Sequence, residues 1–412
     1  MTHTKNTGAL SHVRVLDLSR VLAGPWAGQL LADLGADVIK IERPAKGDDT
    51  RAWGPPWLPD PQGGDTDVSA YYLCTNRNKR SVTVDIAHPE GQDLIRKLAA
   101  QSDVLLENFK VGDLARYGLD YLSLRAINPR LVYCSITGFG QTGPYAARAG
   151  YDFLIQGMGG LMSVTGRPDQ EPGGGPMKVG VALTDILTGL YASNAILAAL
   201  AARERSGEGQ HIDMALLDVQ VACLANQAMN YLTTGENPSR LGNAHPNIVP
   251  YQDFPTSDGH MIVAIGNDEQ FQRFCLAADR PDLAQDVRFT SNQQRVAHRT
   301  ELIALLNQIT QTRSTAQWVS ILGTRSVPCG PINAMDDVFA DPQVVARGMR
   351  TAMSHPVAGE IPLVASPIKL SATPVQYRRP PPMLGEHTDQ VLAEELGLDI
   401  TTIRGLRERG VV

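Results

Sequence analysis

Short apolar runs alternate with helical patterns along the first third of the chain. The predicted helices lie at Trp26–Leu34, Pro89–Ser102 and Leu119–Ile127. The predicted strands are Val13–Leu18, Ala36–Ile41, Ser81–Ile86, Asp103–Glu107 and Leu131–Ile136. Short apolar runs bounded by turn residues are typical of buried strands, and strands that alternate with helices indicate a parallel sheet. The pattern therefore predicts an α/β domain with an open, doubly wound sheet.

Polar and basic residues follow several of these strands. They are Arg20 to Ala23, Glu42 and Arg43, Ile86 and Ala87, and Asn108 and Phe109. In doubly wound sheets, ligands bind outside the carboxyl ends of the strands. The turn after the first strand lacks the glycine pattern G-x-G-x-x-G, so a dinucleotide site is not supported. The expected ligand is a phosphorylated nucleotide that is held without this motif.

A long apolar helix is predicted from Ile186 to Arg205, with Gly207 as its stop signal. Thr184 or Asp185 occupies the expected N-cap position, and capping alone would explain an aspartate there. Two features favour a ligand site instead. The preceding segment is rich in glycine, which allows backbone to approach a ligand closely. The helix is apolar almost all round, so we expect a buried core helix rather than a membrane span, with its first turn facing something other than bulk water.

The second half of the chain predicts a smaller α+β domain. A helix at Asp218–Leu232 and a polar linker lead to a hairpin around Ser257–Gly259. Helices follow near Glu269–Ala278, Gln293–Thr310 and Ala316–Leu322. Beyond Val327, strands are expected around Met349–Ser354 and Pro367–Leu370, and a helical pair ends the chain. Periodicity leaves open whether this last segment returns to the first domain or forms a third.

Length, charge and cysteine content indicate how many domains the chain has and which kinds of partner, bond and compartment are expected. The chain has 412 residues, more than the roughly 250–300 at which a single core stops growing, so two domains are expected. A net charge of −6 argues against a nucleic-acid partner. The 5 cysteines are scattered without a CxxC pair, so we expect neither a disulfide framework nor a structural zinc site, and the reducing cytoplasm fits best. Met1–Gly8 is polar and lacks the apolar segment of a secretory signal.

Residues Asn76 to Arg80 form a dense cationic run before the third predicted strand. One interpretation is a solvated, charged face. The other is a site for phosphates or a carboxylate, because arginine presents a planar pair of donors to both groups. The sequence leaves both interpretations open.

Several motifs, in order along nearly the whole chain, resemble one family. They are Val15–Pro25, Gly35–Pro44, Asn76–Ser81, Glu107–Phe109, Arg148–Asp152, Thr184–Gly189 and Leu384–Thr388. These segments are similar to those of the class III CoA-transferases, the formyl-CoA transferase/carnitine CoA-transferase family. Leu241–Tyr251 and Val327–Asn333 most resemble the branch that acts on succinyl-CoA and a free dicarboxylate such as glutarate.

The resemblance implies an architecture and a set of partners. A large Rossmann-like CoA-binding domain would comprise residues 1–215 and 327–412, with a linker at 216–245 and a small α+β domain at 246–326. Two subunits would interlock as a homodimer. The substrates would be an acyl-CoA thioester and a small carboxylic acid, with no permanently bound cofactor, no metal, no nucleic acid and no membrane.

The resemblance also implies site residues. The family's nucleophilic aspartate falls on Asp185. Its CoA-contact positions fall on Arg20, Val21, Leu22, Ala23, Arg43, Val84, Asp85, Ile86, Ala87, Asn108, Phe109, Lys110, Arg116, Tyr117, Ala149, Gly150, Tyr151 and Asp152. Three departures from formyl-CoA transferase concern the substrate and loop gating. A lysine of that enzyme is replaced by Ala149, a glutamine by Leu22, and its four-glycine loop is missing, with Asn243–Asn247 expected to cover the site instead.

The implied chemistry is covalent catalysis by a carboxylate. Asp185 would form a mixed anhydride with the acyl group and then a thioester with CoA, and backbone N–H groups from the glycine-rich stretches would stabilise the oxyanions. For the distal carboxylate of a diacid, Arg77, Lys79 and Arg80 are candidates. His245 is a candidate near the acceptor, whereas His387 is expected to be structural, at a helix start.

Two other functions remain as alternatives. Racemases of α-methylacyl-CoA belong to the same superfamily, but they carry a histidine where this chain has Tyr151, and tyrosine is a poor base at neutral pH. A non-catalytic CoA-binding protein would require Asp185 to be only a helix cap. The sequence does not identify the acid pair, because glutarate, malate, citramalate, itaconate and mesaconate all fit a succinyl-like pocket.

Overall fold

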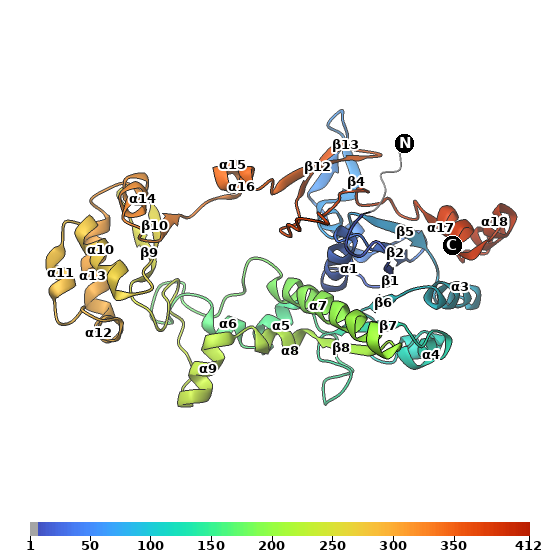
Figure 1. Ribbon diagram of the computed structural model, residues 1–412, viewed down its shortest axis with the longest axis horizontal. Helices are drawn as coiled ribbons and strands as arrows, with labels where there is room; N and C mark the ends of the chain where they lie inside the picture. Colours follow the sequence, from blue (N-terminus) through green and yellow to red (C-terminus); the bar gives the residue numbers. More distant parts are fainter. Residues whose placement is uncertain (1–6) are drawn as a thin grey trace. The chain divides into compact units, whose positions relative to one another are not determined.

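The computed structural model describes residues 7–412, which form two compact units (Figure 1). Unit 1 comprises the described residues up to Gly160 together with Val179–Ala228 and Gln343–Val412. Unit 2 comprises Leu161–Lys178 and Met229–Pro342. Most of the polar stretch Met1–Gly8, in which no secretory signal was expected, lies outside the described residues.

A six-stranded parallel sheet forms the centre of unit 1. Its strands are β1 (Arg14–Asp17), β2 (Asp37–Glu42), β5 (Lys79–Thr83), β6 (Val104–Glu107), β7 (Val132–Thr137) and β8 (His211–Ala215). Their order across the sheet is β5-β2-β1-β6-β7-β8. This is the 3-2-1-4-5-6 order of doubly wound nucleotide-binding folds, and it reverses between β1 and β6. The prediction of an α/β fold with a parallel sheet is confirmed.

Side chains that alternate along the strands build two cores, one on each face of the sheet. On β1, Val15 belongs to one core and Leu16 to the other. The Val15 core includes α1 (Ala23–Asp33) and α7 (Leu183–Ser206). The Leu16 core includes α3 (Pro89–Ala100), α4 (Tyr121–Ile127), α17 (Thr388–Leu396) and α18 (Ile400–Glu408). Helices that cover both faces explain why β6 and β7 are mostly apolar in sequence.

The remaining helices and strands of unit 1 lie around this sheet. They are η1 (Asp49–Ala52), β3 (Trp57–Pro59), β4 (Asp65–Ser69), α2 (Ala70–Leu73), α3 (Pro89–Ala100), η2 (Leu114–Tyr117), α4 (Tyr121–Ile127), α5 (Asp152–Met158), α8 (Leu216–Ala222), β12 (Arg350–His355), β13 (Gly359–Val364), α17 (Thr388–Leu396) and α18 (Ile400–Glu408). Figure 1 shows α17 and α18 beside α3, so the end of the chain returns to the first domain. The strand expected at Pro367–Leu370 is wrong: β13 precedes it and forms a hairpin with β12.

Unit 2 is a small α+β body built on the antiparallel sheet β11-β10-β9. Its aromatic core contains Phe254, Phe271, Phe274 and Trp318. Its strands and helices include β9 (Tyr251–Pro255), β10 (His260–Ala264), α10 (Asp268–Ala277), α11 (Pro281–Gln285), α12 (Asn292–Ala297), α13 (Arg299–Thr310), α14 (Thr315–Thr324), β11 (Cys329–Pro331) and α15 (Met335–Ala340). The hairpin expected around Ser257–Gly259 joins β9 to β10.

The ranges of the two units differ from the expected domain boundaries at three places. Residues 161–178 belong to unit 2, and the expected linker 216–245 is divided, with 216–228 in unit 1 and 229–245 in unit 2. Residues 327–342 also belong to unit 2, because β11 pairs with β10. Helices α6 (Leu161–Val164), α9 (Ala225–Thr234) and α16 (Pro342–Ala346) lie at or across these boundaries.

The long helix α7 buries only one side. Ala192 and Ile196 face the sheet and α1, whereas Leu190 and Tyr191 are 39% and 46% exposed. The expectation that this helix is buried all round is therefore wrong, because an apolar sequence does not by itself identify a covering partner. Among the described helices, α7 is long and apolar enough to cross a membrane, a property that the core helices of globular proteins share.

Candidate active site

Two cavities lie at the carboxyl end of the parallel sheet in unit 1. The first, of about 280 Å³, lies where the loops after β1 and β6 meet, and Asp185 forms part of its wall. The second, of about 720 Å³, is lined by η2 and by residues that follow β2 and β5. The cavities share Arg20, Asp49, Phe109 and Asp113 in their walls, so they adjoin one another and are together called the cleft. The cleft lies where the strand order reverses, which is the usual ligand site of this architecture.

Nearly all residues that the family resemblance assigned to CoA line this cleft. The first cavity contains Arg20, Val21, Leu22, Ala23, Asn108, Phe109, Lys110, Ala149, Gly150 and Tyr151. The second cavity contains Arg43, Val84, Asp85, Ile86, Ala87, Arg116 and Tyr117. Asp152 lines neither cavity. The fold thus brings together short segments that are far apart in the sequence.

Several cationic side chains line the cleft and form either no ion pair or only an exposed one with acidic residues of the described part of the chain. Arg43 and Lys46 line the second cavity and Lys110 the first, and within residues 7–412 none of the three forms an ion pair. Arg116 pairs with Asp113 at 2.8 Å, but both side chains are exposed and such pairs contribute little stability. These cations are free to bind phosphate oxygens by charge-assisted hydrogen bonds.

Asp185 is the third residue of α7, since this helix begins at Leu183 with Ala182 as its N-cap. The prediction that Thr184 or Asp185 is the N-cap is therefore wrong, by two or three residues. The Asp185 carboxylate accepts no hydrogen bond from the residues that the structure describes. Burial, followed by the charge of Asp152, raises its pKa to about 7. A carboxylate with so few partners is available to react with a ligand in the first cavity.

Asp152, the first residue of α5, holds the N-terminus of α7. Its Oδ1 accepts hydrogen bonds from the N–H groups of Thr184 at 2.8 Å and of Asp185 at 3.2 Å. Its Oδ2 accepts from Gln156 Nε2 at 2.7 Å. The first N–H groups of a helix have no partner inside the helix, so a carboxylate there satisfies them. Asp152 thus caps α7 from outside, a role different from the CoA contact that the resemblance implied.

The buried side-chain amides of Gln156 and Gln220 add further hydrogen bonds around the first turn of α7. Gln156 is fully buried, and its Oε1 accepts from the N–H of Val179 at 2.9 Å. Thr184 Oγ1 donates to Gln220 Oε1 on α8 at 2.6 Å. The first turn of α7 is therefore fixed by hydrogen bonds from two other helices, which holds the Asp185 backbone in place.

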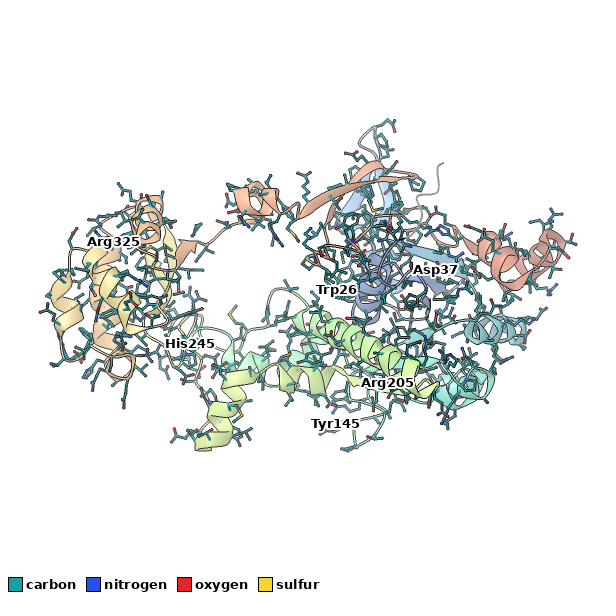
Figure 2. The ribbon with its side chains drawn as sticks, in the orientation of Figure 1. Trp26, Asp37, Tyr145, Arg205, His245 and Arg325 are labelled. Carbon is teal, nitrogen blue, oxygen red and sulfur yellow. The ribbon has the colours of Figure 1, made fainter. Side chains whose placement is uncertain are left out.

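Gly189 lets α1 and α7 approach closely at the site. A Cβ atom on Gly189 would lie 2.7 Å from the carbonyl oxygen of Ala23 and 3.1 Å from Cβ of Trp26. Trp26 lies on α1 (Figure 2), and Ala23, the first residue of that helix, lines the first cavity. The contact brings the N-terminus of α1 to the turn that carries Asp185.

The loop between β1 and α1 is held in a strained conformation. Val21 has a φ of 73°, which is rare for a β-branched residue and costs about 1–3 kcal/mol. On one side of it, the N–H of Arg20 donates to Asn108 Oδ1 at 2.9 Å, and Asn108 Nδ2 donates to the carbonyl of Arg20 at 2.7 Å. This reciprocal pair joins the loops after β1 and β6 across the first cavity.

Sequence reasoning missed Tyr71, an aromatic residue close enough to Asp185 to feel its charge. Burial, followed by the Asp185 charge, raises the pKa of Tyr71 to about 12, so its hydroxyl lies within electrostatic reach of Asp185. The Tyr71 ring packs edge-on against Trp53, with 5.2 Å between centroids. Both residues lie in or next to the long Pro- and Gly-rich excursion after β2, a type of segment that often carries function.

The cationic run at 76–80 is structural, so its nomination for a distal carboxylate is wrong. Arg77 forms a two-pronged ion pair with buried Asp33, with a shortest distance of 2.6 Å. Lys79 is fully buried and lies 3.0 Å from Asp17. Arg80 bonds to Asp37 and to Glu395 of α17. These cations join the sheet to its helices and leave no donor for a substrate.

The two histidines singled out from the sequence occupy different units. His387 directly precedes α17 in unit 1, and its N–H donates to the carbonyl of Ser81. His245 lies in unit 2 (Figure 2), where its Nδ1 accepts from the N–H of Asn247 and its carbonyl accepts from Arg299. Most of the glycine-rich segment also belongs to unit 2, and the glycines that line the first cavity are Gly138 and Gly150.

Comparison with known proteins places this chain. The sequence model of CoA-transferase family III matches residues 10–388. The succinate–glutarate CoA-transferase of Agrobacterium fabrum is 56% identical over 93% of this chain and 95% of its own length. The human succinyl-CoA:glutarate CoA-transferase is 45% identical over 99% of this chain and 90% of its own length. A crystal structure of a CaiB/BaiF family protein from Brucella suis matches with a TM-score of 0.82 and 51% identity, covering 94% of this chain and 100% of that one.

The chain belongs to CoA-transferase family III, and it is an enzyme of that class.

Proposed function

We propose that this enzyme transfers CoA from succinyl-CoA to glutarate through covalent intermediates on Asp185. Relatives named for this reaction are 56% and 45% identical over nearly the whole chain. The observation that carries the proposal is the position of Asp185. Its carboxylate lies in the wall of the cavity that also contains the loops expected to bind CoA.

The first half of the proposed reaction breaks the donor thioester. A carboxylate oxygen of Asp185 attacks the thioester carbonyl carbon of succinyl-CoA, and the CoA thiolate leaves, which gives an aspartyl succinyl anhydride. The thiolate then attacks the aspartyl carbonyl carbon of this anhydride. Succinate departs as a carboxylate and an aspartyl-CoA thioester remains.

The second half repeats these steps with the acceptor. A glutarate carboxylate attacks the aspartyl thioester, and the CoA thiolate leaves with the bonding electrons. The thiolate then attacks the glutaryl carbonyl of the new anhydride, which releases glutaryl-CoA and regenerates the Asp185 carboxylate. Every nucleophile is an anion, so the cycle requires no general base and no net proton transfer.

The N-terminus of α1 is a suitable source of oxyanion donors. Leu22 and Ala23 line the same cavity as Asp185, and the first N–H groups of a helix have no partner within it. The close approach at Gly189 directs this end of α1 toward the first turn of α7. From the sequence we expected the glycine-rich stretches to supply the oxyanion donors, and in this proposal the N-terminus of α1 supplies them instead.

The second cavity suits the nucleotide part of CoA. It contains Arg43 and Lys46 for phosphates and Tyr117 as an apolar ring beside Arg116. The pantetheine arm would then follow the shared wall, past Phe109, into the first cavity. This orientation puts the sulfur near Asp185.

We also propose that two copies of the chain associate as a homodimer. Large apolar side chains are exposed together on three helices that contact one another. They are Phe153, Leu154 and Met158 on α5, Leu190 and Tyr191 on α7, and Val221 on α8. Exposed apolar clusters of this kind are typical of protein interfaces, and the homodimer that the family resemblance implies supports a second copy as the partner. The free thiols of all 5 cysteines support a reducing compartment such as the cytoplasm.

A direct assay tests the reaction. Purified enzyme is incubated with succinyl-CoA and a panel of free acids that includes glutarate, malate, citramalate, itaconate and mesaconate, and new CoA thioesters are separated by chromatography. We expect glutarate to give the highest kcat/KM. A higher value for another acid in the panel would reject glutarate as the acceptor, and no product with any acid would reject the transfer itself.

The covalent route has its own test. With acyl-CoA present and hydroxylamine added, the peptide that contains Asp185 should be recovered as a hydroxamate, whereas Asp185→Ala should yield none and transfer no CoA while still binding CoA. An active Asp185→Ala variant would refute the route. In heavy water without an acceptor acid, 2-methylacyl-CoA should keep its α-hydrogen, and exchange would instead indicate racemase chemistry.

A further inference from the structure

A fully buried ion pair lies beneath the loop that lines the first cavity. Lys40 of β2 and Asp48 have completely inaccessible side chains, with 2.9 Å between Nζ and Oδ2. Burial alone would raise the pKa of Asp48, but Lys40 and the hydrogen bonds from Thr50 hold it at about 2. Buried ion pairs often add little stability over apolar residues, so a pair retained here invites another explanation.

Both members of the pair bind the loop between β1 and α1. Lys40 Nζ donates to the carbonyl of Ser19 at 2.9 Å. The N–H of Val21 donates to both Asp48 oxygens, at 3.2 and 3.3 Å. The pair therefore holds the backbone by hydrogen bonds on either side of Arg20.

Val21, whose N–H donates to Asp48, is the residue with the unfavourable backbone conformation. Val21 has a φ of 73°, and a non-glycine residue keeps such a conformation only where its surroundings enforce it. Asp48 is in turn fixed by the N–H and hydroxyl of Thr50, at 3.0 and 2.8 Å. The strain is thus opposed by groups anchored in β2 and η1.

The conformation of Val21 sets the direction in which the chain enters α1. Leu22, the N-cap, and Ala23, the first residue of α1, follow immediately and line the cavity with Asp185. If Val21 relaxed to a negative φ, the path of the chain into α1 would change, and the N–H groups of these two residues would be reoriented relative to that cavity. A small misplacement of an oxyanion donor is sufficient to slow catalysis strongly.

We propose that Lys40 and Asp48 are positioning residues for CoA transfer, which hold Val21 in its left-handed conformation and thereby aim the first N–H groups of α1 at the acyl group on Asp185. This proposal rests on the proposed function. It assigns the pair a role through the loop and not through contact with substrate.

The main test combines removal of the pair with relief of the strain. Lys40→Met/Asp48→Ala removes both charges together, so no unpaired buried charge remains. We expect kcat with succinyl-CoA and glutarate to fall at least tenfold, with KM for succinyl-CoA changed less than threefold. Adding Val21→Gly should recover most of kcat, because glycine adopts positive φ at no steric cost. The single Val21→Gly variant sets the highest value that this recovery can reach.

A matched control separates position from stability. Arg77→Met/Asp33→Asn removes another buried pair that does not contact residues 19–22. We expect a loss of stability there without the selective loss of kcat. An unchanged kcat in the Lys40/Asp48 double variant, or no recovery with Val21→Gly, would overturn the proposal.

If the double variant does not fold, the ion pair can be left intact. Val21→Pro fixes φ near −65° and removes the N–H that Asp48 accepts. We expect it to lower kcat as strongly as loss of the pair, and an undiminished kcat would overturn the proposal.

Hydrogen exchange measures the loop without any reaction. Exchange in the peptide that covers residues 19–24 should rise at least tenfold in the double variant, and unchanged exchange would contradict the proposal. If wild-type enzyme transfers no CoA, the proposed function fails, while this measurement still decides whether the pair holds the loop.

Discussion

Asp152 Oδ1 accepts a hydrogen bond from the backbone N–H of Asp185 at 3.2 Å, so one carboxylate holds the residue that carries the other. Both carboxylate oxygens of Asp152 accept hydrogen bonds, whereas the Asp185 carboxylate accepts none within the described part of the chain. Two aspartates of the same site therefore have different tasks. Asp152 is anchored as a helix cap, and Asp185 remains available for chemistry.

Asp185→Asn should stabilise the protein most at alkaline pH. Burial and the Asp152 charge raise the pKa of Asp185 from 3.8 to about 7, so the native state loses stability as pH rises through that interval. At pH 8 the native state bears the full free-energy cost of ionising the buried Asp185 carboxyl group, whereas at pH 5 much of this cost is absent because the group is protonated. We expect the stability gain of Asn over wild type to be roughly 3 kcal/mol larger at pH 8 than at pH 5. Urea unfolding at both pH values measures it, and an equal gain at both would contradict the raised pKa.

Asp152→Asn should move the pH profile of the reaction. The nucleophile must be ionised, so kcat/KM of the wild type should decline as pH falls below about 7. Loss of the Asp152 charge removes the second cause of the raised pKa, and asparagine still offers an oxygen to the N–H groups of Thr184 and Asp185. The acidic limb should therefore shift to lower pH, incompletely, because burial remains. A limb that stays in place would show that Asp152 acts only as a cap.

Gly189→Ala should damage both stability and catalysis. The new Cβ would lie 2.7 Å from the Ala23 carbonyl oxygen, so α1 and α7 must separate. We expect a loss of about 1–3 kcal/mol, as for overpacked cores, and a fall in kcat of about tenfold or more because the two helix N-termini move apart. Gly323→Ala is the matched control, since it also lies in a helix but meets nothing within 4 Å. Thermal unfolding and kinetics of both variants decide the matter.

Arg43→Met and Arg77→Met should have opposite signatures. Arg43 lines the second cavity without an ion pair in residues 7–412, so its loss should raise KM for succinyl-CoA about tenfold with little change in Tm. Arg77→Met leaves the buried Asp33 carboxylate unpaired and should cost about 3–5 kcal/mol of stability. If Arg77→Met instead changed only the KM for glutarate, the structural role of the cationic run would be refuted.

Leu190→Glu should weaken the proposed dimer. Leu190 lies on the exposed apolar side of α7, where a charge would have to be desolvated against a second copy. Leu122→Glu is the control, because Leu122 is 71% exposed on α4, which is not one of these three helices. Sedimentation velocity should show dissociation or a lower association constant for the first variant alone. Equal behaviour of the two would exclude the α5, α7 and α8 surface from the interface.

The sequence by itself determined the alternation of strands and helices, the parallel sheet and the candidate nucleophile. The apolar runs in β1, β2 and β6 are a local property, because a strand covered on both faces is apolar at most of its positions. The motif around Asp185 and the polar residues after the strands are local as well. These features required no knowledge of which side chains meet.

The tertiary structure alone decided the partners of the charged residues. Asp152, Asp185 and the run from Arg77 to Arg80 are all polar segments near predicted strand or helix ends, and the sequence gives them similar prospects of contacting a ligand. Packing places Asp33 against Arg77 and directs Asp152 to the first turn of α7, which leaves the Asp185 carboxylate facing the cleft. The reason is physical: the pKa and reactivity of a charged group depend on its desolvation and its neighbours, and both are fixed by contacts between residues that are distant along the chain.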